Sequence, residues 1–287
     1  MSIGYACLNI GTPHTNIRSL MQKNATAEKL TEVTAHNLET LERIVDYNIA
    51  NDIHLYRISS DLIPFGSSPV NTLIWPEIHK EAFERIGSKI RKSGMRVSLH
   101  PGQYTMMNSP TEDVVARAIE DLNYHDKILT ALGADQTNKI VLHVGGSNGD
   151  KAAAMDRFAA NFQRLPEIVQ NRLIIENDER LYNIEDVLNL ANRLQIPAIY
   201  DNLHHAINPP PSGGHDQYWI AEAKKTWKEE DGKQKIHYSQ QAIGKRPGAH
   251  TKTINLETFL QFYNQLADPT IDIMLEVKDK NLSAIKC

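Results

Sequence analysis

Short apolar runs alternate with amphipathic stretches from one end of the chain to the other. The runs are four to seven residues long, which suits buried strands, and the stretches between them carry apolar residues at three- and four-residue steps, as helices do. The predicted strands are residues 3–8, 54–59, 95–100, 139–143, 172–176, 198–201, 235–238 and 271–277. The predicted helices are residues 30–45, 76–93, 111–132, 150–170, 183–194, 216–228 and 256–266.

This regular alternation predicts an α/β fold with a parallel sheet. The sheet can close into a single (β/α)₈ barrel of the TIM type or stay open and doubly wound, and we favour the barrel because polar residues end many different strands. Only a closed ring points all of those strand ends at one axis. Ten residues follow Val277, so we expect the eighth helix to be short or absent. No repeat or clear linker interrupts the pattern, and we predict one domain over residues 1–287.

Histidines and carboxylates gather where the predicted strands end. In a barrel these ends form one face, which is where active sites lie. Five histidines and three acidic residues belong to this set: His100, His143, Glu176, Asp201, His204, His237, His250 and Glu276. We interpret the other seven histidines as surface or loop residues: His14, His36, His54, His79, His125, His205 and His215.

Imidazole and carboxylate together are ligands for zinc, manganese or iron, and the scarcity of cysteine argues against a structural zinc cluster. Eight potential ligands exceed what one ion needs, and a carboxylate such as Glu176 or Glu276 can bridge two ions. Two ions about 3.5–4 Å apart can stabilise both the attacking and the leaving oxygen of a phosphoryl displacement. The pattern therefore favours the hydrolysis of a phosphoester.

Lys235 precedes His237 by two residues, so both side chains lie on the same face of a strand. A lysine buried among metal ligands must lose its proton, pair with an acid or be chemically modified. The alternative is an exposed lysine at the start of the strand, in the basic stretch 233–235.

Composition bears on the protein's partners and on its cellular compartment. The formal net charge of −4 argues mildly against a nucleic-acid partner, although bound divalent cations would change the local balance. The two cysteines, Cys7 and Cys287, suit a reducing compartment. We see no signal peptide and no apolar stretch long enough to cross a membrane, and we expect a cytoplasmic protein, associated with the nucleoid if the source is prokaryotic.

Seven segments, in their order and spacing, carry a family pattern. They are GYACLNIG at 4–11, YRISSDLIPFGSS at 56–68, SLHPGQY at 98–104, VLHVGG at 141–146, IIENDE at 174–179, YDNLHH at 200–205 and KIHYSQ at 235–240. Each segment alone is a weak signal, but together they span nearly the whole chain. On these segments the sequence resembles the UV damage endonuclease family.

The resemblance implies a metal-dependent (β/α)₈ barrel that nicks double-stranded DNA on the 5′ side of ultraviolet photoproducts and leaves a 3′-hydroxyl. It implies that the eight strand-end residues hold two or three divalent ions, with Mn²⁺ preferred over Zn²⁺ or Mg²⁺, and that Lys235 matches a family lysine that can be carboxylated. Tyr5 and Asn9 match active-site residues, and Gln103 and Tyr104 match a pair that probes the duplex at the lesion. We expect a monomer that acts on DNA and has no membrane partner. Nearby cations suit phosphate contacts: Lys224, Lys225, Lys228, Lys245 and Arg246.

One departure concerns the segment after the second strand, where family members commonly carry a further histidine ligand. Ser67 and Ser68 stand there in this chain. We therefore predict at least two ions, and a third only if water or a weaker ligand replaces the histidine.

Three alternatives stay open beside the lesion-specific endonuclease. An abasic-site endonuclease on the same type of barrel would prefer a duplex with a missing base. A metal-dependent sugar isomerase or epimerase would act on a free sugar, although eight ligands and the HPGQY segment fit it poorly. A non-catalytic damage-binding protein would bind lesions without cutting under any metal.

Overall fold

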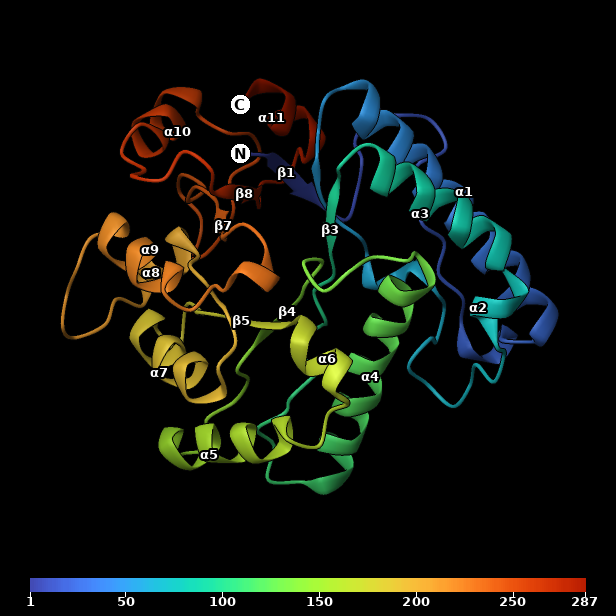
Figure 1. Cartoon of the computed structure of the whole chain (residues 1–287), viewed down its shortest axis with the longest axis horizontal. Helices are drawn as coiled ribbons and strands as arrows, with labels where there is room; N and C mark the ends of the chain where they lie inside the picture. The colour runs from blue at the N-terminus through green and yellow to red at the C-terminus, as the bar shows by residue number, and fades with distance from the viewer.

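Eight short strands, each parallel to its neighbours, form a curled α/β core at the centre of the molecule, and helices surround it (Figure 1). The computed structural model describes the whole chain, residues 1–287. The strands are β1 (Ile3–Ala6), β2 (Leu55–Arg57), β3 (Arg96–Ser98), β4 (Ile140–His143), β5 (Leu173–Glu176), β6 (Ala198–Ile199), β7 (Lys235–Tyr238) and β8 (Asp272–Leu275).

The strands belong to two sheets, with the orders β3-β2-β1-β8-β7 and β4-β5-β6. The two sheets meet at two seams. At the first seam a single parallel bridge links Leu99, just after β3, to Ile140 of β4. At the second seam another single bridge links Asp201, just after β6, to His237 of β7. The predicted eight-stranded ladder is thus interrupted at both seams. At the first, Pro101 follows His100 and has no N–H to donate. At the second, the chain turns into a helix at Asp201, so β6 has only two residues.

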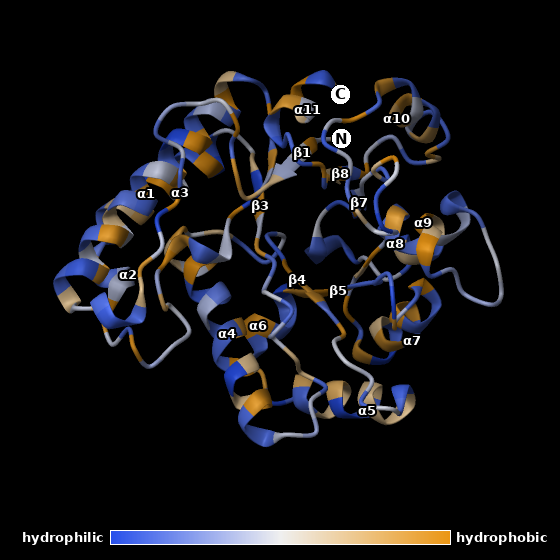
Figure 2. Cartoon of the chain, turned by 180° about the vertical axis from the view of Figure 1, so that it is seen from behind, coloured by the Kyte–Doolittle hydropathy of each residue, from blue (hydrophilic) through white to orange (hydrophobic).

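Helices pack around the strands and leave their polar sides outward, as the mixed hydrophobic and hydrophilic ribbons in Figure 2 show. The helices are α1 (Ala27–Ala50), α2 (Trp75–Ile78), α3 (Lys80–Lys92), α4 (Glu112–Ala131), α5 (Lys151–Phe162), α6 (Glu167–Arg172), α7 (Ile184–Leu194), α8 (Asn202–Ile207), α9 (Asp216–Lys224), α10 (Leu256–Tyr263) and α11 (Asn281–Lys286). Three short 3₁₀ helices are η1 (Gln22–Asn24), η2 (Ser60–Leu62) and η3 (Glu229–Asp231).

The first helix illustrates why the pattern predicted helices well. The Thr26 side chain accepts a hydrogen bond from the Lys29 amide and caps α1, and the apolar stripe that includes Leu38, Leu41 and Val45 is buried. The helix predicted at 150–170 is instead two helices, because Pro166 cannot continue the first. The stretch 76–93 divides at His79. The closing helix α11 has six residues, as short as expected.

The register brings the carboxyl ends of the strands together on one side. His143 at the end of β4 pairs directly with Glu176 at the end of β5, and the bridge between Asp201 and His237 joins the next two strand ends. None of the helices combines the length and the apolar character that a membrane crossing demands. The fold therefore concentrates the predicted polar residues at a single edge of the core.

Candidate metal centre

Glu176 lies at the centre of the polar cluster and is 1% exposed. Its Oε2 lies 3.1 Å from His100 Nε2 and 3.8 Å from His143 Nε2. Its Oε1 lies 2.7 Å from His237 Nδ1 and 3.7 Å from His204 Nδ1. Burial raises the pKa of Glu176, but the charges that His237 and His143 carry once protonated at low pH, together with hydrogen bonds from His100 and His237, outweigh burial and hold the pKa well below its ordinary value. The carboxylate is thus ionised and both of its oxygens face imidazoles.

Three groups of side chains have ligand atoms within 4.8 Å of one another, and Glu176 belongs to all three. The groups are His100–His143–Glu176, Glu176–Asp201–His204 and Glu176–His237–Glu276. Seven of the eight predicted ligands therefore come together in space. A carboxylate shared by neighbouring groups is the arrangement that a bridged polynuclear metal site requires.

Two buried polar atoms in the first two of these groups have no hydrogen-bond partner: His143 Nδ1 and Asp201 Oδ2. Buried polar groups are normally satisfied, so such orphaned atoms at one site call for an ion or water. Burial also lowers the pKa of His143, and burial lowers the pKa of His237 to about 4. Both imidazoles are therefore in the neutral form that binds metal, and the donor set fits divalent cations.

Asp201 and His204 form a local unit at the start of α8. The Asp201 carboxylate accepts a hydrogen bond from the His204 amide at 2.8 Å and so caps the helix. His204 Nδ1 lies 2.9 Å from the Asn177 carbonyl oxygen. Burial lowers the pKa of His204, but the charges of Asp201 and Glu176 dominate and raise it to about 9. Without a metal this imidazole therefore keeps its proton at neutral pH.

Arg57, at the end of β2, belongs to the centre although the sequence pattern did not identify it. Its Nη2 lies 2.6 Å from Glu276 Oε1 and 2.8 Å from His237 Nε2. Burial raises the pKa of Glu276, but Arg57 and His237 together hold it far below its ordinary value. A signal was present in the sequence: Arg57 is the one charged side chain other than a histidine in the apolar run 54–59.

Lys235 is 1% exposed, which rules out the alternative of an exposed lysine. Burial, together with the nearby charges of Arg96 and Arg57, lowers its pKa well below the ordinary value of a lysine. The charged form of Lys235 is therefore disfavoured in this environment.

His250 is the predicted ligand that stands apart. It pairs with Gln241 in an isolated antiparallel bridge and is outside the three groups, although the Glu276 charge acts on it.

Tyr5 and Asn9 lie on and just after β1, next to each other. Asn9 Nδ2 donates to the Tyr5 hydroxyl at 3.0 Å, and that hydroxyl donates to Asn48 Oδ1 at 2.7 Å. Burial is the main cause that raises the pKa of Tyr5, so the phenol is neutral. Asn9 Oδ1 is buried and has no partner. The pair thus keeps one free acceptor inside the molecule.

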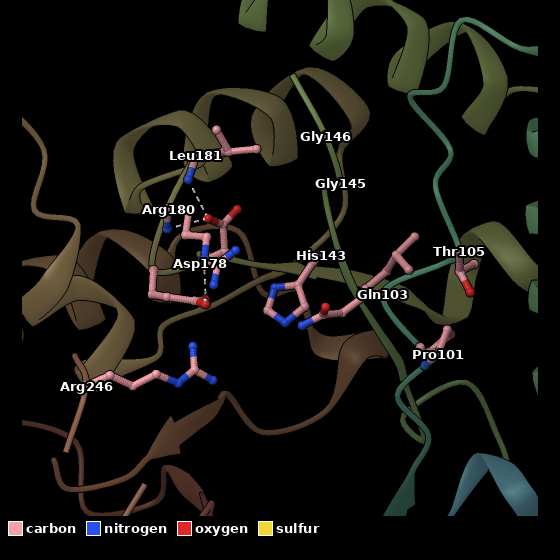
Figure 3. Close-up of a pocket in the computed structure, with 13 residues that line it drawn as sticks. Pro101, Gln103, Thr105, His143, Gly145, Gly146, Asp178, Arg180, Leu181 and Arg246 are labelled. Carbon is pink, nitrogen blue, oxygen red and sulfur yellow. Dashed lines mark hydrogen bonds and ion pairs between the residues drawn. The ribbon is translucent and has the colours of Figure 1, made fainter. Parts of the chain in front are cut away.

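Gln103 and Tyr104 follow the turn after His100 and are both exposed. Figure 3 shows Gln103 reaching toward His143 at the edge of a pocket of about 340 Å³. Tyr104 is 69% exposed, and its ring packs so close to Gly102 that a Cβ there would lie 2.4 Å from it. Gln103 therefore lines the pocket, and Tyr104, the next residue, is exposed to solvent.

Two serines and two histidines outside the cluster also bear on the predictions. Ser67 and Ser68 belong to none of the three ligand groups, and the Ser68 hydroxyl accepts a hydrogen bond from the Val70 amide at 3.3 Å. The prediction of surface positions was wrong for His125 and His205, which are buried. His125 lies on α4 and bonds the Asp121 carbonyl oxygen and the Ser60 hydroxyl, which satisfies both ring nitrogens.

Comparisons with known proteins agree along the whole chain. The model of the family described as UV-endonuclease UvdE matches residues 2–286. A UV DNA damage endonuclease from Clostridium perfringens is 44% identical over 100% of this chain and 70% of its own length. One from Bacillus mycoides is 32% identical over 93% of this chain and 84% of its own length.

Solved structures show the same likeness. The crystal structure of SacUVDE superimposes with a TM-score of 0.94 at 36% identity and covers 100% of this chain and 96% of that one. Endonuclease IV from Thermus thermophilus has a TM-score of 0.59 at 12% identity, over 95% of this chain and 92% of that one. A D-psicose 3-epimerase from Clostridium cellulolyticum has a TM-score of 0.56 at 10% identity, over 82% of this chain and 79% of that one. The last two share only the fold.

Proposed function

The chain belongs to the UV-endonuclease UvdE family and is an endonuclease, and we propose that it hydrolyses the phosphodiester bond 5′ to ultraviolet photoproducts in double-stranded DNA. The products would be a 3′-hydroxyl and a 5′-phosphate, which start excision repair. One observation carries the proposal: three groups of metal-ligating side chains share Glu176. A single-metal site needs neither this number of ligands nor a shared carboxylate.

The proposed ligands are the seven residues of these groups, with His250 as a further ligand from the loop after β7. When bound, two or three divalent ions, Mn²⁺ in our proposal, supply Lewis-acid activation of the phosphate and stabilise charge on the attacking and leaving oxygens. Glu176 holds its two oxygens toward different imidazoles and is placed to bridge ions. Arg57 stays protonated and offsets the charge of the buried carboxylates around it.

Lys235, Tyr5 and Asn9 complete the proposed catalytic set. The neutral amine of Lys235 can add to carbon dioxide, which forms a carbamate and releases one proton. The resulting anion would lie among Arg57, Arg96 and the ions, where a protonated lysine is unfavourable. Asn9 would use its unpartnered Oδ1 to orient a substrate or water, and Tyr5 would hold the Asn9 amide in place.

Gln103 and Tyr104 are the proposed lesion probes. Both are exposed, and Gln103 lines the pocket. A lesion weakens the stacking and pairing that such a pair must displace. We further propose that the two sheets act as one (β/α)₈ barrel and that residues 1–287 work as a single-domain monomer. The overlap with SacUVDE over the full chain supports the first of these proposals.

Incision of a defined duplex tests the function. We expect the purified protein with Mn²⁺ to cut an oligonucleotide duplex with one cyclobutane dimer, at the 5′ side of the dimer, and to leave the matched undamaged duplex largely intact. Labels at each end of the strand identify the cut position and the 3′-hydroxyl. Equal cutting of both duplexes would refute lesion specificity, and stronger cutting of a duplex with one abasic site would favour the abasic-site alternative.

A further inference from the structure

The segment between β7 and α10 begins with a small antiparallel hairpin, residues 241–250, which we call the rim hairpin. Gln241 and His250 form the bridge at its base, and the Ala242 amide donates to the Ala249 carbonyl at 2.7 Å. Gly244 takes a φ of +67° at the turn, a conformation that other residues rarely adopt. The sequence here is QAIGKRPGAH, so the turn carries one apolar residue and two cations.

The Gln241 side chain fixes the shape of the rim hairpin from inside. Its Nε2 donates to the carbonyl oxygens of Ala242 at 3.1 Å and Arg246 at 3.0 Å, and its Oε1 accepts from the Gly248 amide at 2.9 Å. Three hydrogen bonds from one side chain hold both strands and the turn in register. The hairpin is therefore preorganised, and binding through it costs less conformational entropy than binding through a flexible loop.

The rim hairpin lies beside the metal centre. Arg246 lines the same pocket as His143 and Gln103, and Figure 3 shows Arg246 on the opposite side of the pocket from Gln103, with His143 between them. Two acids share this wall. Asp178 accepts hydrogen bonds from the amides of residues 180–182, and Glu179 lies 3.8 Å from His204 Nε2. Neither acid forms an ion pair with Arg246, whose guanidinium is available to a ligand in the pocket.

The two most exposed large hydrophobic side chains of the molecule are close in sequence to two residues that line this pocket: Ile243 lies three residues before Arg246, and Tyr104 follows Gln103. Ile243 is 100% exposed and Tyr104 is 69% exposed. A single exposed apolar residue is ordinary. Here, however, Ile243 stands at the tip of a rigid turn, with the exposed cations Lys245 and Arg246 directly after it. An apolar tip flanked by cations is the combination with which proteins insert a side chain between bases while they hold the adjacent phosphates.

We propose that the rim hairpin is a second DNA-contacting element, which acts from the opposite side of the pocket to Gln103 and Tyr104. Arg246 and Lys245 bind backbone phosphates, and Ile243 inserts against the bases of the distorted duplex. This inference rests on the proposed function for its ligand, DNA. It adds a separate claim, that the damaged duplex is gripped from two sides and that one of the two contacts is apolar.

Removing the apolar contact and removing a phosphate contact should weaken DNA binding in different ways, and binding experiments can distinguish the two. Fluorescence anisotropy in the absence of divalent metal measures the binding of the full-length protein to a duplex with one cyclobutane dimer and to its undamaged match. Ile243→Ser should weaken binding to the damaged duplex at least about 5-fold and leave the undamaged duplex nearly unaffected, since a wedge enters only where stacking is weakened. Arg246→Gln should weaken both and lower the salt dependence by about one phosphate contact.

Ile74→Ser is the matched control, because Ile74 is also an exposed isoleucine, at 61%, but belongs to none of the pocket walls described above. Both hairpin variants should unfold at the wild-type temperature, since each removes an exposed side chain. Wild-type protein that binds and cuts the damaged duplex, with Ile243→Ser and Arg246→Gln indistinguishable from Ile74→Ser, would overturn the hairpin proposal alone. Wild-type protein that neither binds nor cuts it would overturn the proposed function instead.

Discussion

Arg57 Nη2 lies 2.8 Å from His237 Nε2 and also pairs with Glu276 at 2.6 Å, so a permanent cation is built into the candidate metal centre. An arginine cannot shed its proton in a protein, and here it offsets the charge of buried carboxylates before any ion binds. This contact explains how Glu276 stays ionised within the buried cluster, while the pKa of Glu176 is held low by the histidines that face it.

Arg57→Met should therefore destabilise the metal-free protein. Removing one partner of a buried ion pair costs about 3–5 kcal/mol, because the other charge is left without compensation. Added Mn²⁺ should restore much of this loss by supplying positive charge to Glu276. Thermal unfolding with and without Mn²⁺ measures both effects. An unchanged unfolding temperature in the metal-free protein would show that Arg57 does not compensate the carboxylates.

Glu176→Gln should abolish incision while the fold is kept, since glutamine has nearly the same shape but no charge to bridge cations. We expect a loss of at least about 100-fold, because removing even an indirect partner of a metal ligand costs about 10–100-fold. Glu257→Gln is the control, an exposed residue of α10 outside the three ligand groups. Incision rates on the dimer-containing duplex, with circular dichroism as a check of folding, decide the point. A variant at Glu176 with more than a tenth of wild-type activity would remove this residue from the centre.

His204 predicts how metal binding depends on pH. Its pKa is raised from 6.5 to about 9, so the stabilisation it gives the metal-free protein is complete below pH 6.5 and is lost as the pH rises through about 9. Metal binding needs the neutral imidazole and must displace this proton. Mn²⁺ affinity should therefore rise between pH 6.5 and about 9. Calorimetry at neutral pH in buffers of different ionisation enthalpy should detect proton release, and its absence would contradict the assignment.

Lys235 should carry a carbamate when the enzyme is active. Lys235→Ala should lower incision, and a small carboxylic acid such as formate should restore part of the activity by filling the vacated anionic position. In the wild type, ¹³C-labelled bicarbonate should give a carbamate signal by NMR that the variant lacks. The absence of that signal, together with no rescue by formate, would leave Lys235 as an unmodified neutral amine.

Tyr104→Ala should reduce the preference for damaged DNA. Stacking of a base on an aromatic side chain contributes about 1–3 kcal/mol, so the ratio of incision rates on damaged and undamaged duplexes should fall roughly 5- to 100-fold. Tyr218→Ala is the control, an exposed tyrosine on α9. An unchanged ratio would mean that Tyr104 does not read the lesion.

The sequence predicted which polar side chains meet better than it predicted their surroundings. His100, His143 and Glu176 were found because polar residues at the ends of apolar runs must meet when parallel strands share an edge. Arg57 follows the same rule at the end of β2, but an arginine in a strand is more often paired at the surface, and its partners Glu276 and His237 are far away in the chain. Only the fold reveals that contact.

The other differences between the prediction and the structure have two kinds of cause: some are visible in the sequence, and others depend on contacts between distant residues. Pro166 was a visible signal for the break between α5 and α6. The burial of His125 was not visible, because its ring bonds to Ser60, a residue 65 positions away, and to the Asp121 carbonyl of its own helix. The separation of the strands into two sheets also depends on where single bridges replace ladders, which no hydrophobic pattern specifies.

The central claim is that Glu176 organises a centre for several divalent ions, and anomalous diffraction at the manganese edge tests it most directly. Crystals grown with Mn²⁺ should show at least two anomalous peaks at the strand ends, each bonded to an oxygen of Glu176 and to histidines of the three groups. A third peak would show that the serines at 67 and 68 do not prevent a third ion from binding. A map with one ion only, or with none bonded to Glu176, would contradict this claim.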